Sequence, residues 1–199
     1  MTTTPHMNPS DLENLEVELL LEGIHQRYGY DFRSYARPSI DRRVRDYAAT
    51  VGIHRLSELI PLCLHDEARF SDLAQHFSIA VTDMFRDPAV YLTLRQQVVP
   101  TLQTYPFIKV WHAGCATGEE VYSLAIVLQE SGLLHRATLF GTDFNDRALD
   151  TARQGIYPAS QIQTFTSNYQ EAGGTRSFSE YYHARYDSAS MDAALRDRI

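Results

Sequence analysis

The residues best placed to do chemistry are a glycine-bearing turn and the carboxylates that follow it. The turn, Ala113-Gly-Cys-Ala-Thr-Gly118, is followed directly by Glu119 and Glu120. Its glycines, Gly114 and Gly118, let the backbone approach a ligand, and a helix start offers free N–H groups. Asp143 lies 25 residues after Gly118, near the spacing of about 20 at which a carboxylate binds ribose hydroxyls in dinucleotide sites. The pattern predicts a nucleotide or nucleoside site.

The two glutamates indicate what kind of ligand the turn binds. Glu119 and Glu120 suit the positive end of a helix dipole but would repel a phosphate, and one such contact at about 4 Å costs about 1 kcal/mol even in water. A ribose-bearing ligand with a cationic end and no phosphate fits better, and S-adenosylmethionine is such a ligand. The alternative is that both acids only compensate the dipole. A nicotinamide oxidoreductase is disfavoured by the glutamates and by the lack of G-x-G-x-x-G.

The segments around the turn read as alternating strands and helices. Phe107–Trp111 and Ala137–Thr142 are short apolar runs that predict buried strands. Helices are predicted at Ala89–Leu102, at Glu119–Ser131, and from a cap at Asn145 to a stop at Gly155. This order is typical of a right-handed parallel α/β unit. In the polar remainder, 156–199, we expect a hairpin near 176–187 and a helix near 190–198.

The first part of the chain shows helical periodicity and few strand signals. We expect helices from a cap at Asp11, from about Arg37 to Gly52, over Ser57–Leu64 and over Glu67–Phe77. The predicted domains are therefore a helical one at 11–87 and an α/β one at 88–199. Residues 27–45 are rich in arginine, which is either a solvated face or a surface for an acidic partner; the candidates are Arg33, Arg37, Arg42, Arg43 and Arg45.

Composition excludes several classes. The 199 residues carry a formal charge of −7, which argues against a nucleic-acid binder. The absence of an apolar run of 18 residues and of a secretory signal argues against membrane insertion and secretion. Cys63 and Cys115 stand in unrelated contexts, so neither disulfides nor a metal site is predicted. The expected location is the cytoplasm.

Three motifs in order resemble one family. The glycine motif of the CheR-type chemotaxis-receptor methyltransferases is similar to Val110-Trp-His-Ala-Gly-Cys-Ala-Thr-Gly-Glu-Glu-Val-Tyr-Ser-Leu-Ala125. Their ribose-binding strand resembles Gly141-Thr-Asp-Phe-Asn145, and their N-x-T-x-F-F-R-D signature resembles Ala80–Pro88. The resemblance spans about residues 15–199. It implies an all-α bundle followed by a Rossmann-like class I methyltransferase domain. It also implies methylation of chemoreceptor glutamates in bacterial chemosensory signalling, with S-adenosylhomocysteine as product.

The resemblance also implies roles for single residues. Thr82 and Arg86 would hold the methionine end of the cofactor, with Arg86 pairing with its carboxylate and positioning the methyl donor. Glu119 or Glu120 would bind the ammonium; we favour Glu119. Asp143 would accept from the ribose, with Phe144 beside it. The arginines named above would contact the cytoplasmic domain of a chemoreceptor, and a small antiparallel insert near 173–195 would correspond to the receptor-tethering element of some members.

The sequence departs from the family pattern at several points. Ala80 replaces the signature asparagine and Met84 replaces its first phenylalanine. Only 56 residues follow Asp143, and the family's later strand motifs are absent, which predicts an incomplete parallel sheet. Two expectations therefore remain open: that this chain is a truncated, non-catalytic module binding receptor or cofactor, and that a dimer forms through the exposed sheet edges.

Overall fold

A computed structural model describes residues 7–77 and 82–199. They form two compact units, divided between Ile79 and Ala80. The segment from Thr82 to Arg86, grouped with the helical part on sequence grounds, lies in the second unit because Met84 and Phe85 pack into its core. Across the described residues, no helix is long and apolar enough to cross a membrane.

The first unit is helical, as the sequence predicts. Its elements are α1 (Pro9–Tyr28), α2 (Arg37–Thr50), a 3-10 turn (Leu56–Glu58), α3 (Leu59–His65) and α4 (Glu67–Phe77). The predicted cap at Asp11 is wrong: the helix begins earlier because the Asn8 side chain accepts a hydrogen bond from the Asp11 backbone N–H at 2.8 Å. The core-facing stripe of α1 follows helical spacing; it consists of Val17, Leu20, Leu21 and Ile24.

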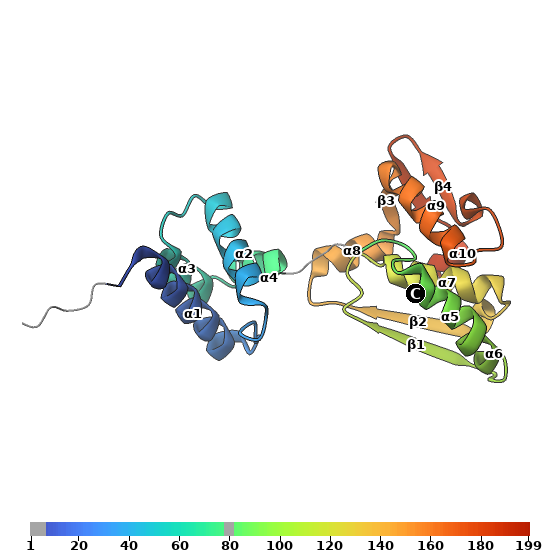
Figure 1. Ribbon diagram of the computed structural model, residues 1–199, viewed down its shortest axis with the longest axis horizontal. Helices are drawn as coiled ribbons and strands as arrows, with labels where there is room; N and C mark the ends of the chain where they lie inside the picture. Colours follow the sequence, from blue (N-terminus) through green and yellow to red (C-terminus); the bar gives the residue numbers. More distant parts are fainter. Residues whose placement is uncertain (1–6, 78–81) are drawn as a thin grey trace, which may run out of the picture. The chain divides into compact units, whose positions relative to one another are not determined.

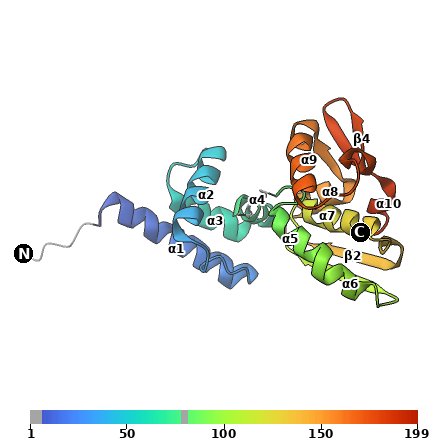
Figure 2. The same cartoon turned by 45° about the vertical axis from the view of Figure 1, so that its right-hand side comes forward.

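The second unit contains the predicted parallel α/β arrangement. In chain order it has α5 (Pro88–Thr93), a π-helical turn (Leu94–Val98), α6 (Val99–Leu102), β1 (Ile108–Ala113), α7 (Glu119–Glu130), a 3-10 turn (Leu134–Arg136), β2 (Ala137–Thr142) and α8 (Asp146–Gln154). Strand β1 pairs in parallel with β2, from Ile108↔Ala137 to Ala113↔Thr142. Figures 1 and 2 show α5, α6 and α7 on one side of this strand pair. Trp111 and Phe140 are exposed on the other face.

The last part of the chain forms a separate antiparallel sheet. Its elements are β3 (Ile156–Pro158), a 3-10 turn (Ala159–Gln161), α9 (Ile162–Glu171), a 3-10 turn (Phe178–Tyr181), β4 (Tyr182–Arg185), β5 (Ser188–Met191) and α10 (Ala193–Arg196). The strand order is β3-β5-β4. The hairpin therefore lies later than the predicted 176–187, and α10 is shorter than the predicted helix at 190–198.

Helix α9 is absent from the sequence prediction, and its composition explains why. Its residues, IQTFTSNYQE, include several polar or β-branched side chains with weak helix propensity. The helix is instead stabilised by burial of Phe165 and Tyr169, which are both fully buried in the core of the second unit. Tertiary packing overrides local preference here.

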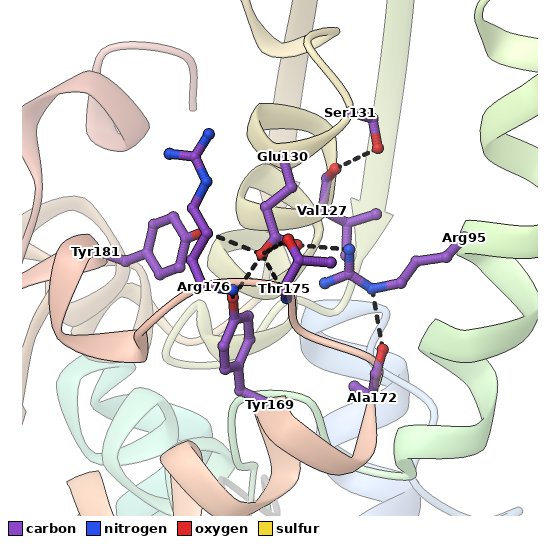
Figure 3. A network of polar contacts seen from close by, with 9 residues as sticks. All are labelled: Arg95, Val127, Glu130, Ser131, Tyr169, Ala172, Thr175, Arg176 and Tyr181. Atoms are coloured by element: carbon purple, nitrogen blue, oxygen red, sulfur yellow. Dashed lines mark hydrogen bonds and ion pairs between the residues drawn. The ribbon is translucent and has the colours of Figure 1, made fainter.

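The Glu130 carboxylate connects this last part of the chain to α7 through one ion pair and several hydrogen bonds (Figure 3). Glu130, at the end of α7, pairs with Arg95 at 2.5 Å and accepts hydrogen bonds from the hydroxyls of Tyr169 and Tyr181. The backbone N–H and hydroxyl of Thr175 also donate to it, each at 3.2 Å. Because these donors come from four separate segments, Glu130 fixes α9 and the following loop against the α/β core.

Candidate functional site

The glycine turn is held open by backbone geometry and by its contact with β2. The N–H groups of Gly114 and Cys115 both donate to the Thr142 carbonyl, at 2.8 and 2.9 Å. Gly114 and Gly118 have φ values of +75° and +93°, which favour glycine. A Cβ on Gly118 would lie 2.8 Å from the Ala152 Cβ, whereas one on Gly114 would meet nothing within 4 Å. Close packing fixes one end of the turn, and open space lies beside the other.

Asp143 joins the end of β2 to the same turn. One of its carboxylate oxygens accepts from the Ala116 N–H and the other from the Asn145 N–H, both at 2.9 Å. A carboxylate has about four lone-pair positions, so both oxygens can accept further bonds. The helix cap is Asn145, whose side chain accepts from the Ala148 N–H. Asp143 is thus not the cap of α8 but a fixed acceptor beside the turn.

Glu119 is a buried carboxylate at the first position of α7. Its residue is only 3% exposed, and the Thr117 hydroxyl donates to it at 2.6 Å. Burial raises the pKa of Glu119, and the negative charge of Asp83 raises it further, although the Thr117 hydrogen bond opposes this. Among the described residues, the side-chain partner found for the Glu119 carboxylate is the neutral Thr117 hydroxyl and not a cation. A buried carboxylate without a cation is costly, so this position suits a cationic ligand.

Glu120 has a different environment, although it is the next residue. Its side chain is 66% exposed, and its Oε1 lies 2.8 Å from Nδ1 of the buried His112. The hydrogen bond with His112 lowers the pKa of Glu120, and partial burial opposes the shift. The sequence left open which glutamate faces a ligand. Their environments differ, because Glu119 is buried and bonded to Thr117 whereas Glu120 is exposed and bonded to His112; which of them faces a ligand stays a prediction.

The segment containing Thr82 and Arg86 is fixed against the first turn of α7. The Phe85 N–H donates to the Ser123 hydroxyl at 2.8 Å, and that hydroxyl donates to the Glu119 carbonyl at 2.6 Å. Phe85 is fully buried and has φ +55°, a strained conformation for a non-glycine residue. Thr82 is half-buried and Arg86 exposed. Ser123 was not identified from the sequence as part of this arrangement, although it lies four residues after Glu119 and therefore on the same helix face.

Two further sequence expectations concern the same segment and strand. Met84 is fully buried in the core of the second unit, consistent with its replacing an aromatic residue of similar volume. Ala80 lies outside the described residues. Phe144 is 43% exposed and follows Asp143 directly. Together Gly114, Gly118, Glu119, Asp143 and Phe144 surround the carboxyl ends of β1 and β2, where parallel α/β folds bind ligands.

The arginine-rich part of the helical unit is largely engaged within the chain. Its ion pairs are Arg33 with Glu22 and Asp31, Arg37 with Asp41 and Glu18, and Arg45 with Glu13. Arg43 donates to the His76 carbonyl at 2.8 Å, and Arg42 is exposed. Three of the five arginines therefore pair with acids of α1, α2 and the segment between these helices. A role for these arginines in binding a partner stays a prediction.

A cavity of about 280 Å³ lies in the second unit beside β2, and its lining includes Gly118 of the glycine turn and Thr142, which directly precedes Asp143. Cys115, Tyr122, Leu139 and Arg196 are among its lining residues, whereas Glu119 and Asp143 are not. It is therefore the chemistry of the turn, rather than the size of this cavity, that marks the candidate site. Within residues 7–77 and 82–199, no group of three or more His, Cys, Asp or Glu side chains is arranged so that it could bind a metal ion.

Comparisons with known proteins point to one family. The family model described as the SAM binding domain of CheR methyltransferases matches residues 80–193, and that of their all-alpha domain matches residues 15–78. A Pseudomonas putida protein named as methyltransferase Cher3 is 47% identical over 186 residues, which cover 94% of this chain and 68% of that protein. The chemotaxis protein methyltransferases of Borreliella burgdorferi and Salmonella typhimurium are 24% and 25% identical over 74% and 72% of this chain. The chain spans only 56% and 50% of their lengths.

Proposed function

Because this chain belongs to the CheR methyltransferase family, we propose that it binds S-adenosylmethionine at the carboxyl ends of β1 and β2 and serves in methylating glutamate side chains of chemoreceptors. The observation that carries the proposal is the buried, raised-pKa carboxylate of Glu119 at the glycine turn. A carboxylate in this setting is stabilised by a cationic ligand and destabilised by a phosphate.

The residues present fit this cofactor. The open space beside Gly114 leaves room for a ligand close to the backbone. Glu119 would bind the ammonium, and Asp143, already oriented by two backbone N–H groups, would accept from the ribose hydroxyls. Thr82 and Arg86 would hold the carboxylate end, with Arg86 forming the charge-assisted contact. Phe144 would lie beside the ribose.

The reaction needs positioning more than acid–base catalysis. The carboxyl group of a solvated glutamate has a pKa well below neutral pH and is therefore ionised there. The cofactor supplies a sulfonium methyl, so that a new O–C bond forms as the C–S bond breaks with its electron pair going to sulfur. The protein's contribution is to hold the two reacting groups in line and to exclude water.

We also propose the cytoplasmic domain of a chemoreceptor as the partner and the cytoplasm as the location. The chemotaxis methyltransferases among the relatives support this substrate class. On the helical unit, Arg33, Arg42 and Arg45 are exposed, and Arg42 is a candidate for contact with an acidic helix bundle. A dimer that pairs the free sheet edges stays a prediction.

Titration calorimetry with S-adenosylhomocysteine tests cofactor binding. We expect measurable binding that is weaker than for a longer family member, because the family's later strand motifs are absent from these 199 residues and the proposed contacts reach only the methionine and ribose ends of the ligand. The absence of any heat at a large excess of ligand would refute a cofactor role.

Transfer of labelled methyl groups to receptor cytoplasmic fragments tests the catalytic part. We expect transfer from a longer protein that contains this chain and none from the 199-residue chain itself. Binding by both without transfer by either would instead favour the alternative function, a regulatory module that binds receptor or cofactor without turnover.

The affinity for S-adenosylhomocysteine should fall as pH decreases through the pKa of Glu119. Burial raises this pKa above its usual value of 4.5 in the free protein, whereas a bound ammonium would lower it again. Binding at mildly acidic pH must therefore release a proton. Calorimetry in buffers of different ionisation enthalpy measures that release, and a flat affinity profile from neutral pH down to the usual glutamate pKa of 4.5 would contradict the assignment.

A further inference from the structure

We propose that Tyr157 is a positioning residue for the cofactor-binding turn and that it couples the antiparallel sheet to Glu119. The proposal rests on the function proposed above. Tyr157 lies on β3, the first strand of the antiparallel sheet, and is only 2% exposed. Its hydroxyl donates to the Thr117 carbonyl at 2.8 Å, in the middle of the glycine turn.

Thr117 is thereby held at two of its polar groups, the backbone carbonyl and the side-chain hydroxyl. Tyr157 binds its carbonyl, and its own hydroxyl donates to Glu119 at 2.6 Å. Rotation of the Thr117–Gly118 peptide would break the first bond and displace the second. The direction in which the Glu119 carboxylate faces therefore depends on a residue that lies outside the turn.

Packing leaves the Tyr157 hydroxyl little freedom to choose another acceptor. Its ring stands edge-on to Tyr122 and to Phe165, with centroids 6.0 Å away in each case. A Cβ added to Gly118 would lie only 3.3 Å from the hydroxyl oxygen, which shows how closely the ring approaches the turn. Burial and the charge of Glu119 raise the pKa of Tyr157 far above its usual value, so the hydroxyl stays a donor at neutral pH.

The position of Tyr157 depends on the antiparallel sheet. It pairs with Ala189 of β5, which in turn pairs with β4. A displacement of this sheet would move the Tyr157 hydroxyl and with it the Thr117 carbonyl. The geometry thus connects the sheet to the Glu119 carboxylate through two residues, Tyr157 and Thr117.

The substitution Tyr157→Phe tests the proposal, with Tyr122→Phe as the matched control. Tyr122 is also buried and also donates to a backbone carbonyl at 2.8 Å, that of Ala152 on α8. Both variants lose one comparable hydrogen bond. We expect Tyr157→Phe to weaken S-adenosylhomocysteine binding about three- to tenfold and Tyr122→Phe to change it less than twofold.

Two readouts separate positioning from a general loss of stability. Without ligand, the Gly118 amide ¹⁵N resonance should shift in Tyr157→Phe but not in Tyr122→Phe, because the hydrogen bond to the Thr117 carbonyl polarises that peptide group. Introducing para-aminophenylalanine at position 157 restores a donor and should recover most of the affinity, which also tests the proposal if the phenylalanine variant folds poorly.

Unchanged affinity in Tyr157→Phe, or an equal loss in both tyrosine variants, would overturn the positioning role. A wild-type protein that binds no S-adenosylhomocysteine would refute the proposed function itself, and this inference with it. Binding by the wild type together with no effect at Tyr157 would refute the present inference alone.

Discussion

Replacing Glu119 with glutamine is expected to weaken S-adenosylhomocysteine binding about ten- to one-hundred-fold. A hydrogen bond to a charged group contributes about 1.5–3 kcal/mol, and each 1.4 kcal/mol is a factor of about ten. Glutamine keeps the shape and still accepts from the Thr117 hydroxyl. It also removes the cost of burying a charge, so thermal stability should stay equal or rise while affinity falls. Calorimetry and thermal unfolding measure the two effects.

The adjacent residue provides the control for this experiment. Glu120→Gln removes the same charge from the same helix start, but Glu120 is exposed and engaged by His112. We expect its effect on affinity to stay below about threefold, the size of an exposed helix-terminal charge effect. Equal losses in the two variants would show that only the general field of the helix start matters, and a larger loss at Glu120 would reverse our assignment.

Replacing Glu130 with alanine is expected to lower the free energy of unfolding of the second unit by about 3–5 kcal/mol. The substitution leaves the Arg95 guanidinium, which is 14% exposed, without its carboxylate. It also leaves the hydroxyls of Tyr169 and Tyr181 without their acceptor (Figure 3). Urea unfolding followed by tyrosine fluorescence and far-UV dichroism measures the change.

The pKa of Glu130 fixes the sign of the accompanying pH effect. Burial alone would raise it, but the hydrogen bonds from Tyr169 and Arg95 outweigh burial and lower it below the usual value of 4.5. The stabilisation is therefore fully present above pH 4.5 and is lost as pH falls through the lowered value. The difference in the free energy of unfolding between wild type and Glu130→Ala should therefore decrease as pH falls below 4.5.

An exposed ion pair serves as the control for Glu130. Asp150 and Arg153 lie 3.1 Å apart on α8 with 64% and 73% of their side chains exposed. Asp150→Ala should change the free energy of unfolding by less than about 0.5 kcal/mol. If Glu130→Ala lowered the free energy of unfolding by no more than Asp150→Ala does, the contacts of Glu130 would not be what holds the antiparallel part in place.

Local signals in the sequence were enough to place the elements around the site. The strand at Ala137–Thr142 and the helix at Glu67–Phe77 are confirmed at both ends. The cap at Asn145 and the stop at Gly155 are also confirmed. Side-chain capping and left-handed glycine geometry act within a few residues, so they can be recognised without tertiary contacts.

Elements that depend on distant contacts were misplaced or missed. Helix α9 forms because Phe165 and Tyr169 are buried against the core. Its sequence has no periodic pattern of aliphatic residues from which a helix could be predicted. The short β3 strand exists because Ile156–Pro158 pairs with β5, about thirty residues later in the chain. Such pairings depend on neighbours that a local pattern does not contain.

The sequence by itself determined the alternation of strands and helices, the glycine turn, and the presence of acids at a helix start. Those features follow from the local chemistry of neighbouring residues. The tertiary structure decided which glutamate is buried, since burial depends on the Thr117 hydroxyl and on the packed segment around Phe85. It also decided that Arg33, Arg37 and Arg45 pair with acids of the same unit, and that Tyr157 reaches the turn. Burial, charge pairing and orientation are properties of contacts between distant residues, so they arise only once the chain has folded.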